Sequence, residues 1–526
     1  MFFKIISIIS SLTFLSRILG YARDLFIARF IGAGFISDAF FVSFKLPNLF
    51  RRLFAEGAMN SAFIPVVSGI KVNQGYKDAN YFLSRILSIV FTFLLPLIIL
   101  FEIFMPVVIS IVAPGFGDLD QKFNLTVNFS RLTFPFLIFI CLSSLIGGYL
   151  NTMSKFAAMA FTPVILNITM LLSLFISFHN DLDQSLIARN LAFSISVAGL
   201  VQLIWLIYNL KINNIKLEFG QLNFLKNFKI DRNIKRFLFL FLPAVIGNGV
   251  YQLNLLIDMI LASTLTDGSI SYLYFADRIN QLPLGVFGIA ISTALLPILA
   301  EQIKKNFFLK ANLTINYCLQ IGLVISIPSS FGIFTLAEHI INVLFVRGEF
   351  TYNDSKSTSD ALKALCLGLP AFIFVKILSV VFFAREDTKT PVYIALAAMS
   401  VNLIFNLILI EFFFHVGLAM ATTIAAWFNF FLLLFILKRK NILKLSKSTY
   451  IILFKSIFSS LVMFLSINFL LTNNFFMLNY EEVFILNIFK LLTVIFLGSF
   501  IYIILIYFLK LSYLLKFKLG EENQQK

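Results

Sequence analysis

The chain is a succession of apolar stretches, each about 20 residues or longer, which is the length a helix needs to cross the hydrocarbon core of a bilayer. Helices suit that setting because they satisfy their backbone hydrogen bonds internally, without water. The composition agrees, since 59% of the residues are hydrophobic and 13% are charged, about half the charged share of a soluble domain. We therefore predict an all-α polytopic membrane protein with about 14 transmembrane helices.

The loops between these stretches alternate in their content of basic residues. One set contains the cluster 211–236 and the run 438–447, both rich in Lys and Arg, whereas the other set is acidic and has few bases, among them Lys122. Lys and Arg gather in cytoplasmic loops, so the asymmetry predicts a multi-pass protein with both termini in the cytoplasm. The same bias accounts for the net charge of +16, and we expect membrane lipids and no nucleic acid as its counterpart.

An internal repeat is visible at an offset near 235 residues. The first copy contains Pro135, Ser144 and Asn167, and the second contains Pro370, Ser379 and Asn402. Leu-Pro pairs at Pro47 and Pro283 correspond in a similar way. Six spans per copy is an even number, so both copies keep one orientation, which predicts two parallel lobes around a central cavity. The predicted divisions are an N-lobe at 1–210, a basic cytoplasmic linker at 211–236, a C-lobe at 237–440 and a two-helix appendage with a cytoplasmic tail at 441–526.

The first two spans carry many charges for membrane helices. They are Arg17, Arg23, Asp24, Arg29, Asp38, Lys45, Arg51, Arg52 and Glu56. One such residue costs about 2.5–3.5 kcal/mol at the bilayer centre, so these side chains must face protein or water. Helical spacing places Asp38, Lys45 and Arg52 on one stripe, and Pro47 frees a backbone carbonyl near Ser43, as in helices that line cavities.

The eighth span is the counterpart of the second span and adds Asp277 and Arg278. Taken together, Arg17, Arg23, Arg51 and Arg278 outnumber their acids, and guanidinium forks suit a phosphate or diphosphate. The alternative is internal pairing, for example of Arg52 with Glu56 or of Arg17 with Asp24, while Asp38 could simply favour a helix start. The first interpretation predicts a transporter with an anionic cargo.

A second polar set consists of Asp258 and Asn254 in the seventh span and Asn402, Asn406 and Thr422 in the eleventh and twelfth spans. Oxygen atoms of this kind suit a small hard cation. The alternative is hydrogen bonding between helices, which Asn and Thr commonly provide in membranes.

Few features of the sequence favour an enzyme. Asp118-Leu-Asp120 and Asp181-Leu-Asp183 are D-x-D triplets of the kind that holds a metal in membrane glycosyltransferases, and this remains an alternative. The three cysteines lie singly in apolar stretches and predict neither disulfides nor a zinc site. The sequence contains no HExxH or P-loop. We therefore predict a transporter without a catalytic residue.

Several motifs resemble the MurJ (MviN) family. They are SRILGYARD at 16–24, GAG at 32–34, SDAF at 37–40, KLPNLFRRLFAEG at 45–57, APGF at 113–116, YFADR at 274–278, PLGV at 283–286 and KTPV at 389–392. The resemblance covers about the first twelve spans. It implies a lipid II flippase of the MOP exporter superfamily in the bacterial inner membrane, which serves peptidoglycan synthesis, cell-wall biogenesis and cell shape. The alternative is another MOP exporter, for a polyprenyl-linked oligosaccharide or a drug.

The resemblance also implies roles for individual residues. By motif match, the critical charges are Arg17, Arg23, Asp38, Arg51 and Arg278. Some members of the family bind Na⁺ through residues that match Asp258, Asn402, Asn406, the carbonyl of Leu418 and Thr422. Asn406 stands where those members have an acid. The last two spans are expected to line a groove for the lipid tail, and the expected partners are lipid II, membrane lipids and the cell-wall synthesis machinery. No cofactor is expected beyond a coupling ion such as Na⁺.

Overall fold

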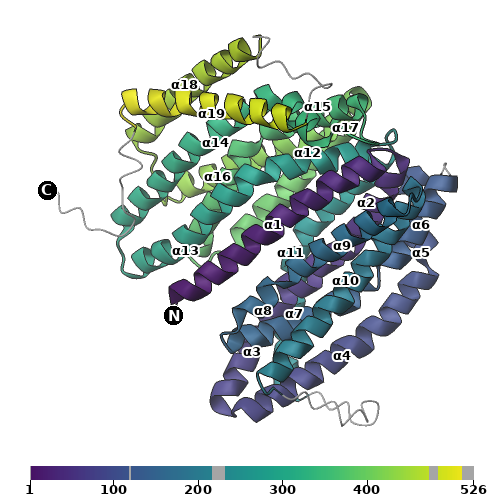
Figure 1. The fold of residues 1–526 in the computed structure, drawn as a ribbon. Coiled ribbons are helices and arrows are strands. Elements are labelled where there is room, and N and C mark those ends of the chain that lie inside the picture. Colours follow the sequence, from purple (N-terminus) through teal and green to yellow (C-terminus); the bar gives the residue numbers. More distant parts are fainter. Residues whose placement is uncertain (1, 118–119, 216–230, 473–483, 512–526) are drawn as a thin grey trace. The chain divides into compact units, whose positions relative to one another are not determined.

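The computed structural model describes residues 2–117, 120–215, 231–472 and 484–511, without the side chains of residues 2–7, 56–58, 246–248 and 250–251. Within these residues the regular structure is helical (Figure 1). The chain forms two compact units. The first comprises Met1–Ser271 together with Arg347–Phe350, and the second comprises Tyr272–Val346 and Thr351–Lys526.

The described part of the first unit contains eleven α-helices and two short helical segments. They are α1 (Phe2–Ile31), α2 (Phe35–Phe50), the π-helix η1 (Arg51–Met59), α3 (Asn60–Asn73), α4 (Tyr76–Ile103), α5 (Met105–Val112), the 3₁₀ turn η2 (Pro114–Phe116), α6 (Asp120–Thr133), α7 (Phe136–Thr152), α8 (Phe156–Ala160), α9 (Thr162–His179), α10 (Gln184–Ile212) and α11 (Arg232–Ser263).

The second unit begins within α12 and is also helical in the part described. Its elements are α12 (Ser269–Pro283), the π-helix η4 (Leu284–Gly288), α13 (Ile289–Lys304), α14 (Phe308–Phe345), α15 (Tyr352–Cys366), α16 (Leu369–Phe383), α17 (Lys389–Arg439), α18 (Lys447–Leu471) and α19 (Phe484–Phe508). The long α14 packs against α15, α16, α18 and α19 and forms much of this unit's core.

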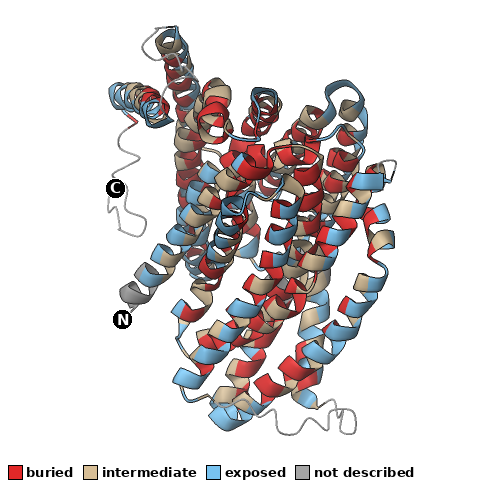
Figure 2. Ribbon diagram, turned by 45° about the vertical axis from the view of Figure 1, so that its right-hand side comes forward, coloured by how far each residue is buried: buried red, intermediate tan, exposed pale blue. Residues whose placement is uncertain are grey.

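Ten of the described helical segments are long and apolar enough to cross a membrane, or eleven if the bent pair α15–α16 is one span. Helix α17 covers two of the predicted spans, because Phe414 has non-helical dihedral angles (φ 49°, ψ −130°) and divides it. Many helices have buried residues on one side and exposed residues on the other (Figure 2). Phe93 on α4 and Phe496 on α19, for example, are exposed. The protein is therefore a multi-pass membrane protein, whereas the count of 14 stays a prediction.

Pro47 lies inside α2, which continues to Phe50, and the carbonyl that the proline frees has a partner. Proline cannot donate to the carbonyl four residues earlier, and the hydroxyl of Thr133 on α6 donates to this Ser43 oxygen at 2.8 Å. The helix then continues as η1, a form whose hydrogen bonds span five residues. Within η1, the Ala55 carbonyl accepts the hydroxyl of Ser144 at 2.6 Å. The second span is thus α2, η1 and α3 in succession, with its irregular part fixed by α6 and α7.

The matching proline of the second copy also precedes a π-helix, but directly. Pro283 is the last residue of α12, and the π-helix η4 begins at the next residue. The eighth span is therefore also an interrupted helix, built from α12, η4 and α13.

The compact units do not follow the predicted lobe boundaries. The C-lobe was expected to begin at residue 237, but α11 belongs to the first unit because it packs against η1, α3 and η2. The turn Arg347–Phe350, which interrupts the second unit in sequence, also belongs to the first unit. Its glycine has a φ of +60°, and a side chain there would collide with the carbonyl oxygen of Arg29. The division into moving lobes stays a prediction.

Candidate substrate-binding site

Arg23 is buried in α1 and bound to the acid that follows it in the sequence. Its Nη2 and Nε atoms lie 2.7 Å and 3.0 Å from Oδ1 of Asp24. Nη1 donates to Oδ1 of Asn167 on α9 at 3.0 Å, and the guanidinium lies 5.6 Å from the centroid of the Phe44 ring. Arg23 is 4% exposed and Asp24 is 1% exposed. The expected excess of base over acid therefore does not hold at Arg23, because the neighbouring carboxylate neutralises it within α1.

The other arginines of the first two spans are more accessible. Arg17 is exposed, and no hydrogen bond or ion pair joins it to any other residue that the structure describes. Arg51, the first residue of η1, is half-buried, and its Nε donates to Oδ1 of Asn48 at 3.0 Å. Its guanidinium is thus oriented by a neutral side chain one turn earlier.

The charged stripe predicted on the second span does not have one environment. Asp38 is buried, Lys45 is half-buried and Arg52 is exposed. The seven-residue spacing behind that prediction applies to a continuous α-helix, and the α-helical hydrogen bonding ends at Arg51, where η1 begins. The predicted partner of Arg52, the side chain of Glu56, lies outside the described part of the chain.

Arg278 lies on α12, five residues before Pro283 and the start of η4. It is half-buried, and its Nη2 donates to the hydroxyl of Tyr274 at 2.6 Å. The guanidinium also lies 4.9 Å from the centroid of the same ring. The preceding Asp277 is exposed and accepts from Gln281 at 3.3 Å. Like Arg51, Arg278 donates to a side chain one helical turn earlier.

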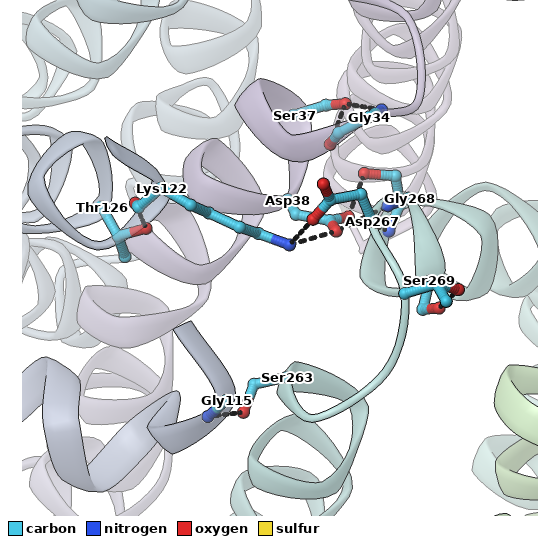
Figure 3. Close-up of polar contacts among 12 residues, drawn as sticks. Gly34, Ser37, Asp38, Gly115, Lys122, Thr126, Ser263, Asp267, Gly268 and Ser269 are labelled. Atoms are coloured by element: carbon cyan, nitrogen blue, oxygen red, sulfur yellow. Dashed lines mark hydrogen bonds and ion pairs between the residues drawn. The ribbon is translucent and has the colours of Figure 1, made fainter. Parts of the chain in front are cut away.

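Asp38 is a buried anchor in this structure, and not the cavity charge that was predicted. Its Oδ1 accepts from the backbone N–H of Ser271 at 2.9 Å and from the hydroxyl of Ser271 at 2.7 Å. Its Oδ2 accepts from the backbone N–H of Gly268 at 2.8 Å and from Nζ of Lys122 at 3.0 Å (Figure 3). Lys122 was not among the predicted functional residues. The available signal was a basic residue in an otherwise acidic loop.

The candidate cation ligands form hydrogen bonds among themselves. In the second unit, Nδ2 of Asn406 donates to Oδ1 of Asn402 at 2.9 Å, and Nδ2 of Asn402 donates to Oγ1 of Thr422 at 3.5 Å. The Thr422 hydroxyl donates to the Leu418 carbonyl at 3.0 Å. Asp258 belongs to the first unit and accepts from Asn254 at 3.4 Å. These bonds join residues of α17 to one another, and cation binding by the set stays a prediction.

The acidic triplets do not form a metal site in the described part of the chain. Asp118 lies outside the described residues, and Asp120 begins α6. Asp183 is the N-cap of α10, where its side chain accepts from the backbone N–H of Ser185 at 3.2 Å. The described residues contain no group of three or more His, Cys, Asp or Glu side chains that could hold a metal ion.

Comparison with known proteins shows the family. The family model described as "Lipid II flippase MurJ" matches residues 27–491. The chain belongs to the MurJ family. A similar MurJ relative, "Probable lipid II flippase MurJ" of Rickettsia prowazekii (strain Madrid E), is 41% identical over 426 residues, which are 81% of this chain and 82% of the relative. The protein of the same name from Buchnera aphidicola subsp. Acyrthosiphon pisum (strain APS) is 39% identical, over 86% of this chain and 87% of its own length.

Solved structures agree with the family assignment. "Lipid II flippase MurJ, inward closed conformation" is 30% identical, with a TM-score of 0.79, and the match covers 94% of this chain and 97% of the other. An inward-facing MATE family multidrug transporter of the MOP superfamily has a TM-score of 0.66 at 15% identity, with 83% and 97% covered. The second match shows a shared fold. The MurJ chain thus has the helical architecture of MOP transporters.

Proposed function

We propose that this MurJ family member is a lipid II flippase of the bacterial inner membrane. It moves the undecaprenyl-diphosphate-linked peptidoglycan precursor from the cytoplasmic to the periplasmic leaflet by alternating access of two lobes. The family match over residues 27–491 supports this function. The basic loops at 211–236 and 438–447 support an orientation with both termini in the cytoplasm.

The observation that carries the proposal is the position of three arginines. One is an exposed residue of α1, and the other two lie on the spans that contain the π-helices η1 and η4. Arg17 is exposed on α1, Arg51 is the first residue of the π-helix η1, and Arg278 lies shortly before the π-helix η4; Arg51 and Arg278 are half-buried. Guanidinium groups bind phosphate oxygens through paired N–H donors. Arg17, Arg51 and Arg278 therefore bind the diphosphate of lipid II, and Arg23 holds α1 against α9 through Asn167.

No covalent step is needed for this transport, so the protein is a carrier and not an enzyme. The arginines bind the diphosphate, and the polyprenyl tail stays in lipid along the exposed apolar faces of α18 and α19, such as Phe454 and Ile503.

Membrane potential assists export. Moving one charge through 100 mV is worth about 2.3 kcal/mol, so a diphosphate of charge near −2 gains up to about 4–5 kcal/mol on leaving a negative interior. No cofactor is required, and the cell-wall synthesis enzymes are the partners that consume the product.

Substitution of the three arginines tests this function. In a strain depleted of its own lipid II flippase, Arg17→Ala, Arg51→Ala and Arg278→Ala each fail to restore growth while the protein still inserts. The purified variants bind lipid II more weakly than the unmodified protein does, and their preference for lipid II over an uncharged prenyl lipid is reduced. Arg→Lys at Arg51 or Arg278 also loses function, because a point charge cannot replace bidentate geometry.

The matched control is Lys305→Ala, which removes an exposed base that forms a surface ion pair with Glu301. Such pairs contribute little, so this variant grows and binds normally. Normal growth of all three arginine variants would exclude the diphosphate site. Equal binding of lipid II and of other polyprenyl-diphosphate sugars would instead indicate an exporter with another cargo.

A further inference from the structure

A buried ionic cluster joins three elements of the first unit at the turn between α11 and α12 (Figure 3). Asp38 comes from α2, Lys122 from α6, and Asp267 and Gly268 from the turn itself. Nζ of Lys122 lies 3.0 Å from Oδ2 of Asp38 and 2.7 Å from Oδ1 of Asp267. Lys122 and Asp38 are 3% and 1% exposed, whereas Asp267 is 48% exposed. The single ammonium thus bridges one buried and one partly exposed carboxylate.

Asp38 uses both of its oxygens at the start of α12. One oxygen accepts the backbone N–H and the hydroxyl of Ser271, and the other accepts the backbone N–H of Gly268 as well as the ammonium. These N–H groups belong to the first turn of α12 and the residue before it, where donors have no partner within the helix. The buried carboxylate therefore fixes the position at which α12 begins. Its charge requires a counter-charge at this depth, and Lys122 supplies it.

Lys122 is itself held in place from several sides. Its ammonium lies 4.1 Å from the centroid of the Phe116 ring in η2. Beside it, the backbone N–H of Gly115 donates to the hydroxyl of Ser263 at 3.3 Å. A side chain at Gly115 would approach within 2.3 Å of the Ser263 carbonyl oxygen, so only glycine fits between η2 and the end of α11. These contacts hold the turn that leads into α12 against α2, α6 and η2.

We propose that Lys122 is a positioning residue for substrate binding, which acts through Asp38 on the start of α12 and so on Arg278. Arg278 lies on the same helix as Ser271, about two turns further along. The proposal rests on the proposed function, in which Arg278 binds the diphosphate. Lys122 does not touch the cargo in this assignment. It acts through the carboxylate that accepts hydrogen bonds from the first turn of the helix that carries Arg278.

The test compares lipid II binding with thermal stability in purified full-length protein. Lys122→Met alone leaves two acids without their counter-charge and is expected to destabilise the protein, so it cannot separate the two roles. The double variant Lys122→Met/Asp38→Asn removes both buried charges and is expected to recover the melting temperature. We expect the dissociation constant of this double variant for lipid II to rise by about tenfold or more. The size of the effect is taken from residues that position metal ligands, whose loss lowers metal affinity about 10- to 100-fold.

A double-mutant cycle with Arg278→Ala identifies the route of the effect. If Lys122 acts through Arg278, the Lys122/Asp38 double variant causes no further loss of lipid II affinity in the Arg278→Ala background. A merely structural role predicts independent, additive losses. The matched control is Lys356→Met, which removes an exposed lysine in the first turns of α15 and leaves binding unchanged.

The possible results are distinct. Wild-type affinity in the stable Lys122/Asp38 double variant, or additive losses in the cycle, would overturn the role of Lys122. Wild-type affinity in Arg278→Ala would overturn the proposed diphosphate site itself. Loss of affinity in Arg278→Ala with normal affinity in the Lys122/Asp38 variant would keep the proposed function and reject only this inference.

Discussion

The ion pair of Arg23 and Asp24 allows a direct test of what the buried arginine of α1 does. In Asp24→Asn, the guanidinium stays buried at 4% exposure and keeps its bond to Asn167, but it loses its counter-charge. Two unit charges about 4 Å apart attract by about 4 kcal/mol at an effective dielectric constant of 20. Breaking a buried pair by removing one partner costs about 3–5 kcal/mol, which agrees with that figure. We therefore expect Asp24→Asn to lower the free energy of unfolding by about 3–5 kcal/mol.

The double variant Arg23→Met/Asp24→Asn separates stability from binding. Removal of both charges leaves no uncompensated ion, and replacement of a buried pair by apolar groups is often neutral or stabilising. Thermal unfolding in detergent measures the first quantity, and lipid II binding measures the second. Because we assign Arg23 to holding α1 against α9, we expect the double variant to recover most of the lost stability and most of the lipid II affinity.

The control on the same helix is Arg29→Met, since Arg29 is exposed and its guanidinium lies 5.7 Å and 5.8 Å from the centroids of two phenylalanine rings. Its loss costs about 1 kcal/mol or less. A stable double variant that binds lipid II as weakly as Arg278→Ala would refute the reasoning and return Arg23 to the diphosphate site. Unchanged stability of Asp24→Asn would refute the estimate for the pair.

Two further predictions concern α17. The N–H and hydroxyl of Thr390 hold the pKa of Asp387 below its ordinary value of 3.8, and Lys440 adds to this effect. The contribution of ionised Asp387 to stability is therefore present at neutral pH and is lost as the pH falls through the lowered pKa. The melting temperatures of wild type and Asp387→Asn are expected to differ at pH 7 and to converge below about pH 3.8. Asn406→Asp adds a negative oxygen to the neutral set Asn402, Asn406 and Thr422 on α17. Na⁺ is therefore expected to raise the melting temperature of this variant more than K⁺ does, and to stabilise it by about 2.7 kcal/mol at 100 times the dissociation constant. Equal stabilisation of the unmodified protein by Na⁺ would contradict the need for an acid at this position.

The sequence predicted local interruptions of the helices better than it predicted their partners. Pro47 indicated a free carbonyl near Ser43 because proline lacks an N–H, and that consequence depends on the chain alone. The identity of the donor depends on packing, and Thr133 lies far along the chain on another helix. The same limit applies to Arg23. Charge counting along the first two spans treated its neighbour Asp24 as one acid among several, whereas rotamers within α1 bring the two side chains together.

Asp38 illustrates why charge and periodicity alone misassign a buried polar residue. A carboxylate in a membrane helix must find donors, and both a water-filled cavity and a helix terminus satisfy that requirement. Sequence spacing related Asp38 to its own helix, but its donors come from α6 and from the start of α12. Only tertiary structure brings those donors to it. Arg51 and Arg278 differ from Asp38 in this respect, because each is oriented by a side chain one turn earlier on the same helix. These contacts join residues three and four positions apart, so local sequence could anticipate them, whereas it could not anticipate the donors of Asp38.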